Sequence, residues 1–290
     1  MKPFEFIEEK RIYRDEEIPP FGDLSFDHYL LENWNIASIK SELEQKEEMV
    51  RGWLALGGVG RIKYHKKVLS QYQEAAAGVS PKQPLFPTIP PGIPQHFQTP
   101  QQRAELLIVE PMMMWVRTWF GNEKTTRDEA DGTYKKLCKH ADGFGAGFIE
   151  GNFAFEDDLE FEDRTGGPTG TGITPSYVLA LLKRYPDVID GYHGPSEKSI
   201  AYIEEGNMVG KQKGLMMVAD KIACETGAVL LIGINDFGEM LPKRLRIKAD
   251  DVVVFHANWT NQYQDLEENG EEGEVGELCC YDGDDAWALS

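Results

Sequence analysis

The sequence predicts an α/β or α+β fold in which a helical N-terminal part and a proline-rich linker precede a sheet domain. Apolar residues recur at helical spacing in the first 80 residues, and prolines crowd residues 81–100. Later in the chain, apolar runs of strand length alternate with amphipathic stretches, an order typical of α/β proteins. We therefore divide the chain into a helical region 1–80, a linker 81–100, an α/β domain 101–261 and an acidic tail 262–290.

Two amphipathic helices are predicted in the N-terminal region, separated by Gly57-Gly58. One covers about 36–56 and the other about 61–77, and their apolar residues follow helical spacing. These residues are Ile36, Ile39, Leu43, Val50 and Leu54 in the first helix and Tyr64, Val68 and Tyr72 in the second. The linker prolines exclude helix and central strand from residues 81–100, so this segment either marks a domain boundary or wraps the surface as a strap.

The α/β domain begins with an apolar segment, 101–120, that predicts a buried helix broken or kinked at Pro111. A polar helix over 125–139 follows. Thr174-Pro175 is a good helix start, because Thr can cap the helix and Pro suits its first position. From these patterns we expect strands near 148–155, 187–192, 228–234, 245–247 and 251–256, with helices near 174–185, 196–205 and 214–224.

An apolar run that ends in consecutive carboxylates is the stretch most suggestive of chemistry. Phe148, Phe153 and Phe155 have the bulk of a buried strand, whereas the acids Glu156, Asp157 and Asp158 that follow them would repel one another if crowded. A hard divalent cation would offset that repulsion, because Mg²⁺, Ca²⁺ and Mn²⁺ prefer carboxylate oxygens. The composition of this run also fits a solvated acidic turn without a metal.

Three further positions are candidate site residues. Asp236 follows the predicted strand 228–234, at the end where ligands bind in open α/β sheets. His193 and His256 each follow a predicted strand, which favours a ligand or polar-contact role, although a single His is more often structural.

Charge and cysteine content exclude several classes of function. Asp and Glu number 49 against 30 Lys and Arg, for a formal net charge of −19, which disfavours nucleic acid and anionic membranes as partners. No window has the roughly 20 apolar residues of a membrane span, and the first residues lack the pattern of a secretion signal. The four cysteines lack zinc spacing. We expect a cytoplasmic or otherwise intracellular protein, with a tail that is either solvated or a docking strip for a basic partner.

A family resemblance follows from three motifs. Phe155-Glu156-Asp157-Asp158-Leu159-Glu160 is similar to the acidic metal motif of GT-A-type glycosyltransferases, and Thr174-Pro175-Ser176-Tyr177 resembles the start of the helix after it. Gly191-Tyr192-His193-Gly194 resembles the turn that ends the next strand. The segment Val254-Phe255-His256-Ala257-Asn258-Trp259-Thr260 is similar to the late strand whose His assists metal or diphosphate binding.

The resemblance implies transfer of a sugar from a nucleotide-sugar donor with Mn²⁺ or Mg²⁺ as cofactor. Glu156, Asp157, Asp158 and His256 would hold the metal, and His193 and Gly194 would contact the substrate. Asp236 would act as the general base toward the acceptor hydroxyl. The Gly- and Thr-rich loop 165–173 would close over the donor and exclude water.

Two other functions remain open on the sequence alone. His193-Gly194 with Ser196 and the strand 228–234 weakly resemble the His-Gly-Thr opening of ADP-ribosyltransferases. A non-catalytic structural or assembly subunit, for example a virus or phage particle protein located in the virion, would also combine an extended arm, a proline-rich strap and an acidic tail. Assembling proteins use straps and apolar faces to pack on neighbouring subunits.

Overall fold

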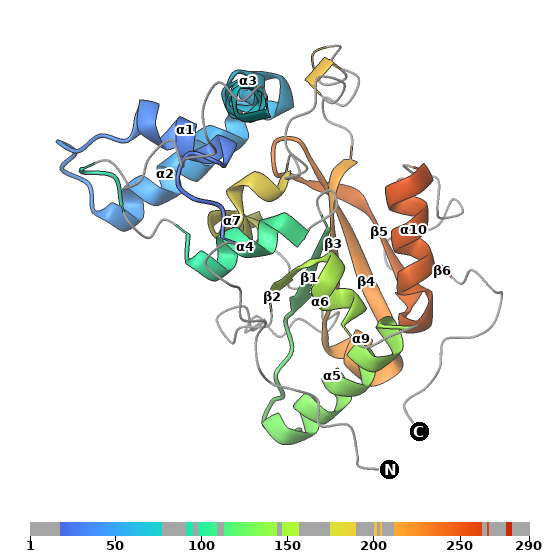
Figure 1. Ribbon diagram of the computed structural model, residues 1–290. Coiled ribbons are helices and arrows are strands. Elements are labelled where there is room, and N and C mark those ends of the chain that lie inside the picture. Colours follow the sequence, from blue (N-terminus) through green and yellow to red (C-terminus); the bar gives the residue numbers. More distant parts are fainter. Residues whose placement is uncertain are drawn as a thin grey trace.

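The computed structural model describes residues 18–76, 91–94, 98–108, 113–143, 147–156, 175–189, 200–201, 204, 212–262, 266 and 277–279. These residues form an α/β fold, as predicted, in which helices cover both faces of a mixed sheet (Figure 1). None of the helices in these ranges combines the length and the apolarity needed to cross a bilayer.

The sheet has six strands in the order β2-β1-β3-β4-β5-β6. Their bounds are β1 Met113–Arg117, β2 Ala154–Glu156, β3 Gln212–Ala219, β4 Ala228–Asn235, β5 Met240–Lys248 and β6 Glu277–Cys279. Strand β1 is parallel to both of its neighbours, β3 to β5 form an antiparallel meander, and β6 is parallel to β5. All strands except β4 therefore end at the same edge of the sheet, called the carboxyl edge below.

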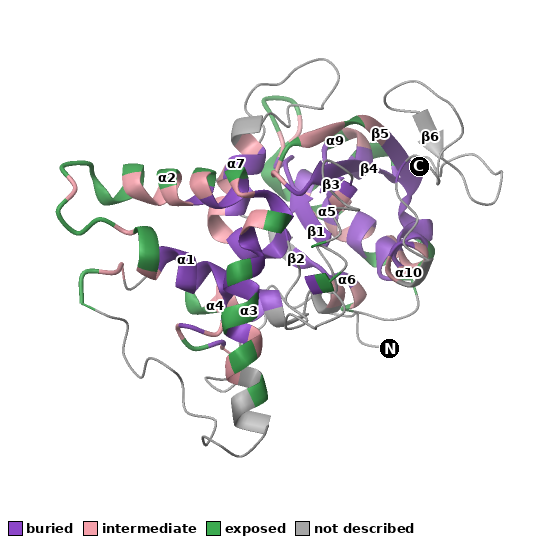
Figure 2. Ribbon diagram, turned by 90° about the horizontal axis from the view of Figure 1, so that it is seen from above, coloured by how far each residue is buried: buried purple, intermediate pink, exposed green. Residues whose placement is uncertain are grey.

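One face of the sheet is covered by the N-terminal helices together with α4, α7 and a short 3-10 helix. Their bounds are α1 Ser25–Asn33, α2 Glu42–Ala55, α3 Gly57–Ala76, α4 Pro100–Ile108, α7 Pro175–Arg184 and η3 Pro186–Ile189. Side chains such as Trp53 of α2 and Leu181 of α7 lie in one core with Met114 and Val116 of β1. Figure 2 shows these helices buried on their inner sides and exposed at their outer ends. The helical region and the sheet thus share a core.

The other face carries the second core and the remaining helices. Their bounds are α5 Arg127–Ala141, α6 Phe148–Asn152, α9 Lys221–Thr226, η4 Ala249–Asp251 and α10 Val252–Gln262. Met113 and Trp115 point to this face because side chains alternate along a strand, and they pack with Leu137 of α5 and Phe255 of α10. The central strands are buried on both faces.

Several predicted elements are confirmed. Strands β4 and β5 and helices α2, α3, α5 and α7 lie within a few residues of their predicted positions, although α2 begins only at Glu42 and α3 already at Gly57. Capping boxes fix two of the starts, Ser41 with Glu44 in α2 and Thr126 with Glu129 in α5. Part of the predicted helix 196–205 falls on described residues, and Ile200, Ala201 and Glu204 are helical there.

Other predicted elements are wrong. The predicted helix at 101–120 is right only for its first part, α4, because the chain is strand β1 from Met113, and most of the predicted helix at 214–224 is strand β3. These two runs are apolar on both sides and carry no period that distinguishes a fully buried strand from a buried helix. The predicted strand at 251–256 is the start of α10, and the one at 187–192 falls on the short helix η3. Of the predicted strand 148–155, residues 148–152 are helix α6 and only the end belongs to β2.

Candidate functional site

The parallel strands β2, β1 and β3 create a reversal of strand order at the carboxyl edge. From β1 the chain proceeds to β2 on one side and then to β3 on the other, and ligands of open α/β sheets bind outside the strand ends at such a reversal. Glu156 is the last residue of β2 and pairs with Val116 of β1. The acidic stretch therefore starts at this edge, while Asp157 and Asp158 lie outside the described residues.

Arg117, at the end of β1, is buried and makes hydrogen bonds to two partners. Its Nη2 donates to Asp131 Oδ1 of α5 at 2.5 Å, and its Nε donates to the carbonyl oxygen of Trp119 at 2.9 Å. The guanidinium also lies 4.3 Å from the ring centroid of Phe120 and 4.2 Å from that of Tyr134, within the range of cation–π attraction. Arg117 thus fixes the chain that leaves β1 against α5.

The loop from β1 to α5 is fixed by backbone hydrogen bonds, one to β3 and one within the loop. Thr118 N–H donates to the carbonyl oxygen of Ala219 in β3, and Asn122 N–H donates to that of Thr125 at 2.9 Å. Gly121 has φ of 102°, and a Cβ there would lie 2.7 Å from the Thr125 carbonyl oxygen. Only glycine adopts this backbone conformation without strain, and it lets the chain turn sharply directly after Trp119 and Phe120.

Trp119 is 8% exposed, and its indole nitrogen is buried without a hydrogen-bond partner in the part of the chain that the structure describes. Two other buried indoles are satisfied: Trp115 Nε1 donates to the Tyr134 hydroxyl at 3.1 Å, and Trp53 Nε1 donates to the Pro186 carbonyl oxygen at 2.9 Å. A buried donor without an acceptor costs about 1–3 kcal/mol, so Trp119 is an exception that requires an explanation.

A buried ion pair lies beyond β3 at the same edge. Arg246 of β5 donates to both carboxylate oxygens of Asp220, at 3.1 and 2.6 Å, and to the Ala228 carbonyl oxygen at 2.8 Å. Asp220 also caps α9 by accepting from Ala223 N–H at 2.8 Å. Arg117 and Arg246 therefore each already have a carboxylate partner.

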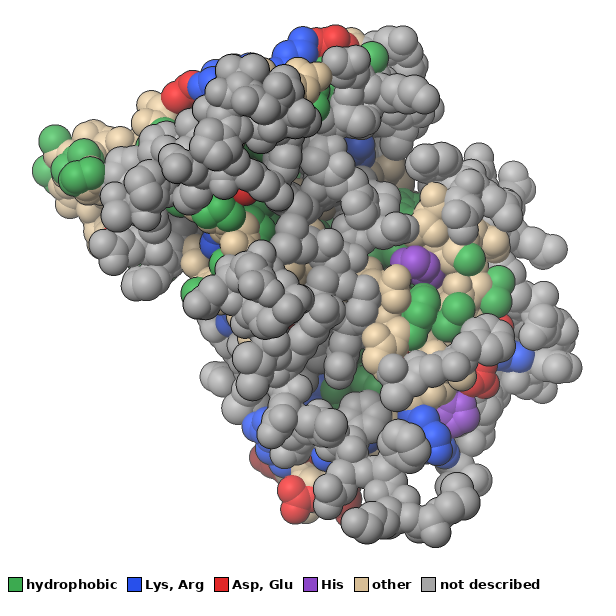
Figure 3. Space-filling view, viewed as in Figure 1, with side chains coloured by type: hydrophobic (Ala, Val, Ile, Leu, Met, Phe, Trp, Pro, Cys, Tyr) green, Lys and Arg blue, Asp and Glu red, His purple; other side chains and the backbone are tan. Residues whose placement is uncertain are grey.

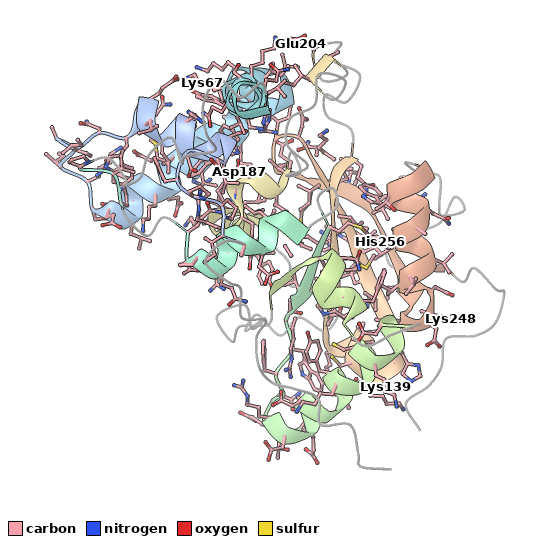
Figure 4. All side chains as sticks on the ribbon, viewed as in Figure 1. Lys67, Lys139, Asp187, Glu204, Lys248 and His256 are labelled. Carbon is pink, nitrogen blue, oxygen red and sulfur yellow. The ribbon has the colours of Figure 1, made fainter. Side chains whose placement is uncertain are left out.

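His256 is placed by helix α10 and not by a strand end, which corrects the predicted context of this residue. Its ring lies 5.2 Å from that of Phe148 and 5.5 Å from that of Phe153, between α6 and α10 (Figure 4). Phe153 precedes Glu156 by three residues. The structure thus brings His256 against the segment that leads into the acidic stretch, and its aromatic contacts account for its burial.

Asp236 lies at the opposite edge of the sheet from Glu156, which corrects the expectation that both serve one site. Strand β4 is antiparallel to β3, so Asn235 pairs with Gln212 at the start of β3, whereas Glu156 is level with Val218 and Leu230. Six residues separate Leu230 from Asp236, which at about 3.3 Å per residue amounts to about 20 Å. A general base must lie within about 3 Å of the attacking oxygen.

The surroundings of Asp236 show what it does instead. Its Oδ2 accepts from the backbone N–H of Gly58 at 3.1 Å, at the start of α3, and its carbonyl oxygen accepts from Arg61 Nη2 at 2.8 Å. Arg61 also donates to the Trp53 carbonyl oxygen and is fully buried. Asp236 therefore joins the β4–β5 turn to the junction of α2 and α3, and it stabilises the N-terminal end of α3.

The remaining predicted site residues, His193, Gly194 and the loop 165–173, lie outside the described residues. Within the described ranges no three His, Cys, Asp or Glu side chains converge as metal ligands would. Because the side chains of Glu156, Asp157 and Asp158 are not among those described, the metal site stays a prediction.

No protein-family model, no curated protein and no solved structure matches this chain. The residues that sequence reasoning missed at the carboxyl edge are Arg117, Trp119, Asp220 and Arg246. The available signal was a charged residue at the end of an apolar run, as in Trp115-Val116-Arg117 and Val218-Ala219-Asp220.

Proposed function

We propose that the chain is a metal-dependent glycosyltransferase whose donor site lies at the carboxyl edge beside β1. The observation that supports this most is the position of Glu156, where the acidic stretch leaves β2 at the reversal of strand order. The resemblance of Phe155–Glu160 to an acidic metal motif agrees with this position.

The charges of the described residues favour a cation at this edge. Arg117 is paired with Asp131, and Arg246 with Asp220, so these two arginines do not remain to neutralise Glu156, Asp157 and Asp158. Carboxylates of this number suit Mn²⁺ or Mg²⁺. We include His256 as a nitrogen ligand of the metal, because its ring packs against Phe153, three residues before Glu156.

Each component has a defined part in the proposed reaction. A metal bound by the acidic stretch would supply charge that stabilises the diphosphate leaving group of a nucleotide-sugar. The protein would hold the donor against the rigid loop that follows β1. Asp236 is not the base of this site, since it lies at the other edge of the sheet.

The test is nucleotide release from a panel of nucleotide-sugars with Mn²⁺ or Mg²⁺. We expect release by the wild type, loss of at least tenfold in Asp158→Asn, and wild-type release by Asp236→Asn once its lower stability is taken into account. Asp236→Asn is the matched control, because it removes one carboxylate at the opposite edge. Absence of release from every donor, or equal release from wild type and Asp158→Asn, would refute the proposal.

A second function, assembly through self-association, is favoured by an exposed apolar tip formed by Ile36, Ile39 and Leu43. These side chains are 71%, 103% and 71% exposed at the end of the α1–α2 hairpin. Figure 3 shows apolar side chains gathered at this protruding end. Exposed apolar clusters of this kind mark contact sites.

The charges near the tip fit a second copy of this chain. Lys40 pairs with Glu48, Lys46 with Glu42, and Glu47 with both Arg51 and Lys183. An isologous contact brings identical residues together, and charges already neutralised within each chain do not repel their copies. The linker also approaches the tip, because a Cβ on Gly92 would lie 2.4 Å from the Ile36 side chain.

The solution mass tests this second function. We expect a concentration-dependent dimer for the wild type and a monomer for Ile39→Asp, with Val59→Asp, which alters an exposed valine on α3, as the control that dimerises normally. A monomeric wild type at high concentration would refute self-association, and an unchanged dimer in Ile39→Asp would refute the tip as its site.

A further inference from the structure

The proline-rich linker adds a second apolar surface to the tip formed by Ile36, Ile39 and Leu43. Linker residues 91–94, called the linker turn below, are exposed at their first two positions and half-buried at the other two. Figures 1 and 2 both show this short segment beside the loop between α1 and α2, at the protruding end of the molecule. Two stretches that lie far apart in the sequence therefore meet at the tip.

The contact between the linker turn and the tip is close. Gly92 has φ of 89°, in the left-handed region that favours glycine, and a Cβ there would lie 2.4 Å from Cδ1 of Ile36 and 2.7 Å from its Cγ1. Because position 92 has no side chain, the linker backbone can rest against Ile36. Even with this contact Ile36 is 71% exposed, so most of its side chain can still be covered by a partner.

The tip alone is too small for a stable interface between two copies of the chain. Ile36, Ile39 and Leu43 bury about 60–120 Å² each when they are covered. Each partner in a standard protein–protein interface contributes about 800 Å². An interface centred on the tip must therefore extend over the elements next to it.

The linker turn suits this extension better than the charged surface beside the tip. The charged side chains there are already paired within the chain, so covering them would cost desolvation without adding a new partner. These pairs are Lys40–Glu48 and Lys46–Glu42. The linker turn has no charged residue, and Pro91 and Ile93 offer apolar surface. The fixed φ of proline also reduces the conformational freedom that is lost on binding.

We infer that the linker turn of each copy packs against the tip of the other copy, with Pro91 of one touching Ile39 of the other. In an isologous contact every such pair occurs twice, once in each direction across the twofold axis. The interface then combines the tip and the linker turn of both copies. This inference rests on the self-association proposed above and gives the proline-rich linker a part in it.

Cross-linking between two differently tagged copies tests the contact. Cys279→Ser and Cys280→Ser are introduced first, whereas Cys138 and Cys224 are buried and can stay. One tagged chain then carries Ile39→Cys and the other Pro91→Cys, and a short bismaleimide is added at a concentration where the wild type is a dimer. We expect a covalent dimer that carries both tags.

Val59→Cys in place of Pro91→Cys is the matched control for the cross-linking. Val59 is 47% exposed, and it follows the end of α2 opposite to the tip. We expect this pair of chains to give no more covalent dimer than chains without an added cysteine.

A charge on the linker turn gives a second measurement that needs no cross-linker. Pro91 is exposed, so Pro91→Asp leaves the fold intact but buries an unpaired carboxylate in the proposed interface. We expect the dissociation constant of the dimer, measured by sedimentation over a concentration series, to rise about tenfold or more. Pro242→Asp, at an exposed proline on β5, is the control that should dimerise like the wild type.

The outcomes separate this inference from self-association itself. A dimer with both tags, together with weaker association of Pro91→Asp, supports the inference. If the wild type dimerises and Ile39→Asp does not, but no dimer with both tags forms and Pro91→Asp associates within twofold of the wild type, the inference is overturned while self-association through the tip stands. If the wild type stays monomeric at high concentration, self-association fails and the inference fails with it.

Discussion

Arg103 of α4 binds the carboxylate of Asp27 in α1 through two hydrogen bonds of 2.9 Å, one from each terminal nitrogen. The same guanidinium donates to the carbonyl oxygens of Pro19 and Pro20 at 2.8 Å. Asp27 in turn accepts from the backbone N–H groups of Gly22 and Leu24. This buried pair therefore fastens the turn before α1 to a helix about 80 residues later in the sequence.

Replacing Arg103 with Met should lower the free energy of unfolding by about 3–5 kcal/mol, because it leaves the Asp27 carboxylate buried without its cation. Urea unfolding measures the change. The double variant Arg103→Met with Asp27→Asn should lose less than the sum of the two single variants, since it removes both charges together. A loss below about 1 kcal/mol in Arg103→Met would show that the pair behaves like an exposed one.

Gly57→Ala should destabilise the fold by about 2 kcal/mol or more. Gly57 has φ of 59°, and an added Cβ would lie 2.7 Å from the ring of Phe237. The matched control is Gly132→Ala in α5, where a Cβ meets nothing within 4 Å, so the change should stabilise the helix by about 0.5–1 kcal/mol. Equal effects of the two substitutions in thermal or urea unfolding would contradict this account of the α2–α3 junction.

Burial lowers the pKa of His28 below its usual value of 6.5, although the Gly22 carbonyl and Asp27 partly counteract the shift. The unfolded chain therefore binds more protons at this position than the folded chain. Stability from His28 is fully present above about pH 6.5 and is lost as the pH falls toward the folded value. The free energy of unfolding should decline less between pH 7 and pH 5 in His28→Gln than in the wild type. Parallel declines would exclude His28 as a source of acid sensitivity.

Burial also raises the pKa of the Cys224 thiol on α9 far above its usual value. The thiolate is the reactive form, so Cys224 should resist alkylation in the native protein at pH 8 and react rapidly in denaturant. Mass spectrometry after timed exposure to iodoacetamide locates the label. Rapid native labelling at Cys224 would show that α9 opens readily from α5.

The elements predicted correctly from the sequence are those whose signals are complete within one segment. Strand β4 is a continuous apolar run that contains Val229, Ile232 and Ile234, and α7 starts at Pro175 directly after Thr174. Strands β1 and β3 were missed because each contains a pair of methionines, Met113-Met114 and Met216-Met217, which favour helix until a central place in the sheet makes them extended. Helix α10 was missed because it starts with Val252-Val253-Val254, residues that favour strands until packing decides otherwise.

The candidate site was only partly predictable for a related reason. The acidic stretch was found from composition, and the structure places its start at a strand end. Asp236 was assigned to the same site because it follows a strand, but a strand end lies at the ligand edge only when the strand runs parallel to its neighbours. Strand β4 does not. The pairs Arg117–Asp131 and Asp220–Arg246 depend on which elements meet, information that no local pattern contains.

The position of β1 also has a consequence for the order in which the chain folds. Strands β3, β4 and β5 are consecutive and antiparallel, so they can pair as soon as they are made, whereas β1 joins Met113 to Leu215. During synthesis about 100 further residues are therefore added before the apolar segment Met113–Val116 can pair with β3. Unpaired apolar strands are prone to aggregate during this interval. Chains truncated before β3 should depend on chaperones to stay dispersed, and full-length chains should not. Ribosome-bound nascent chains of increasing length would reveal that dependence ending once β3 has emerged.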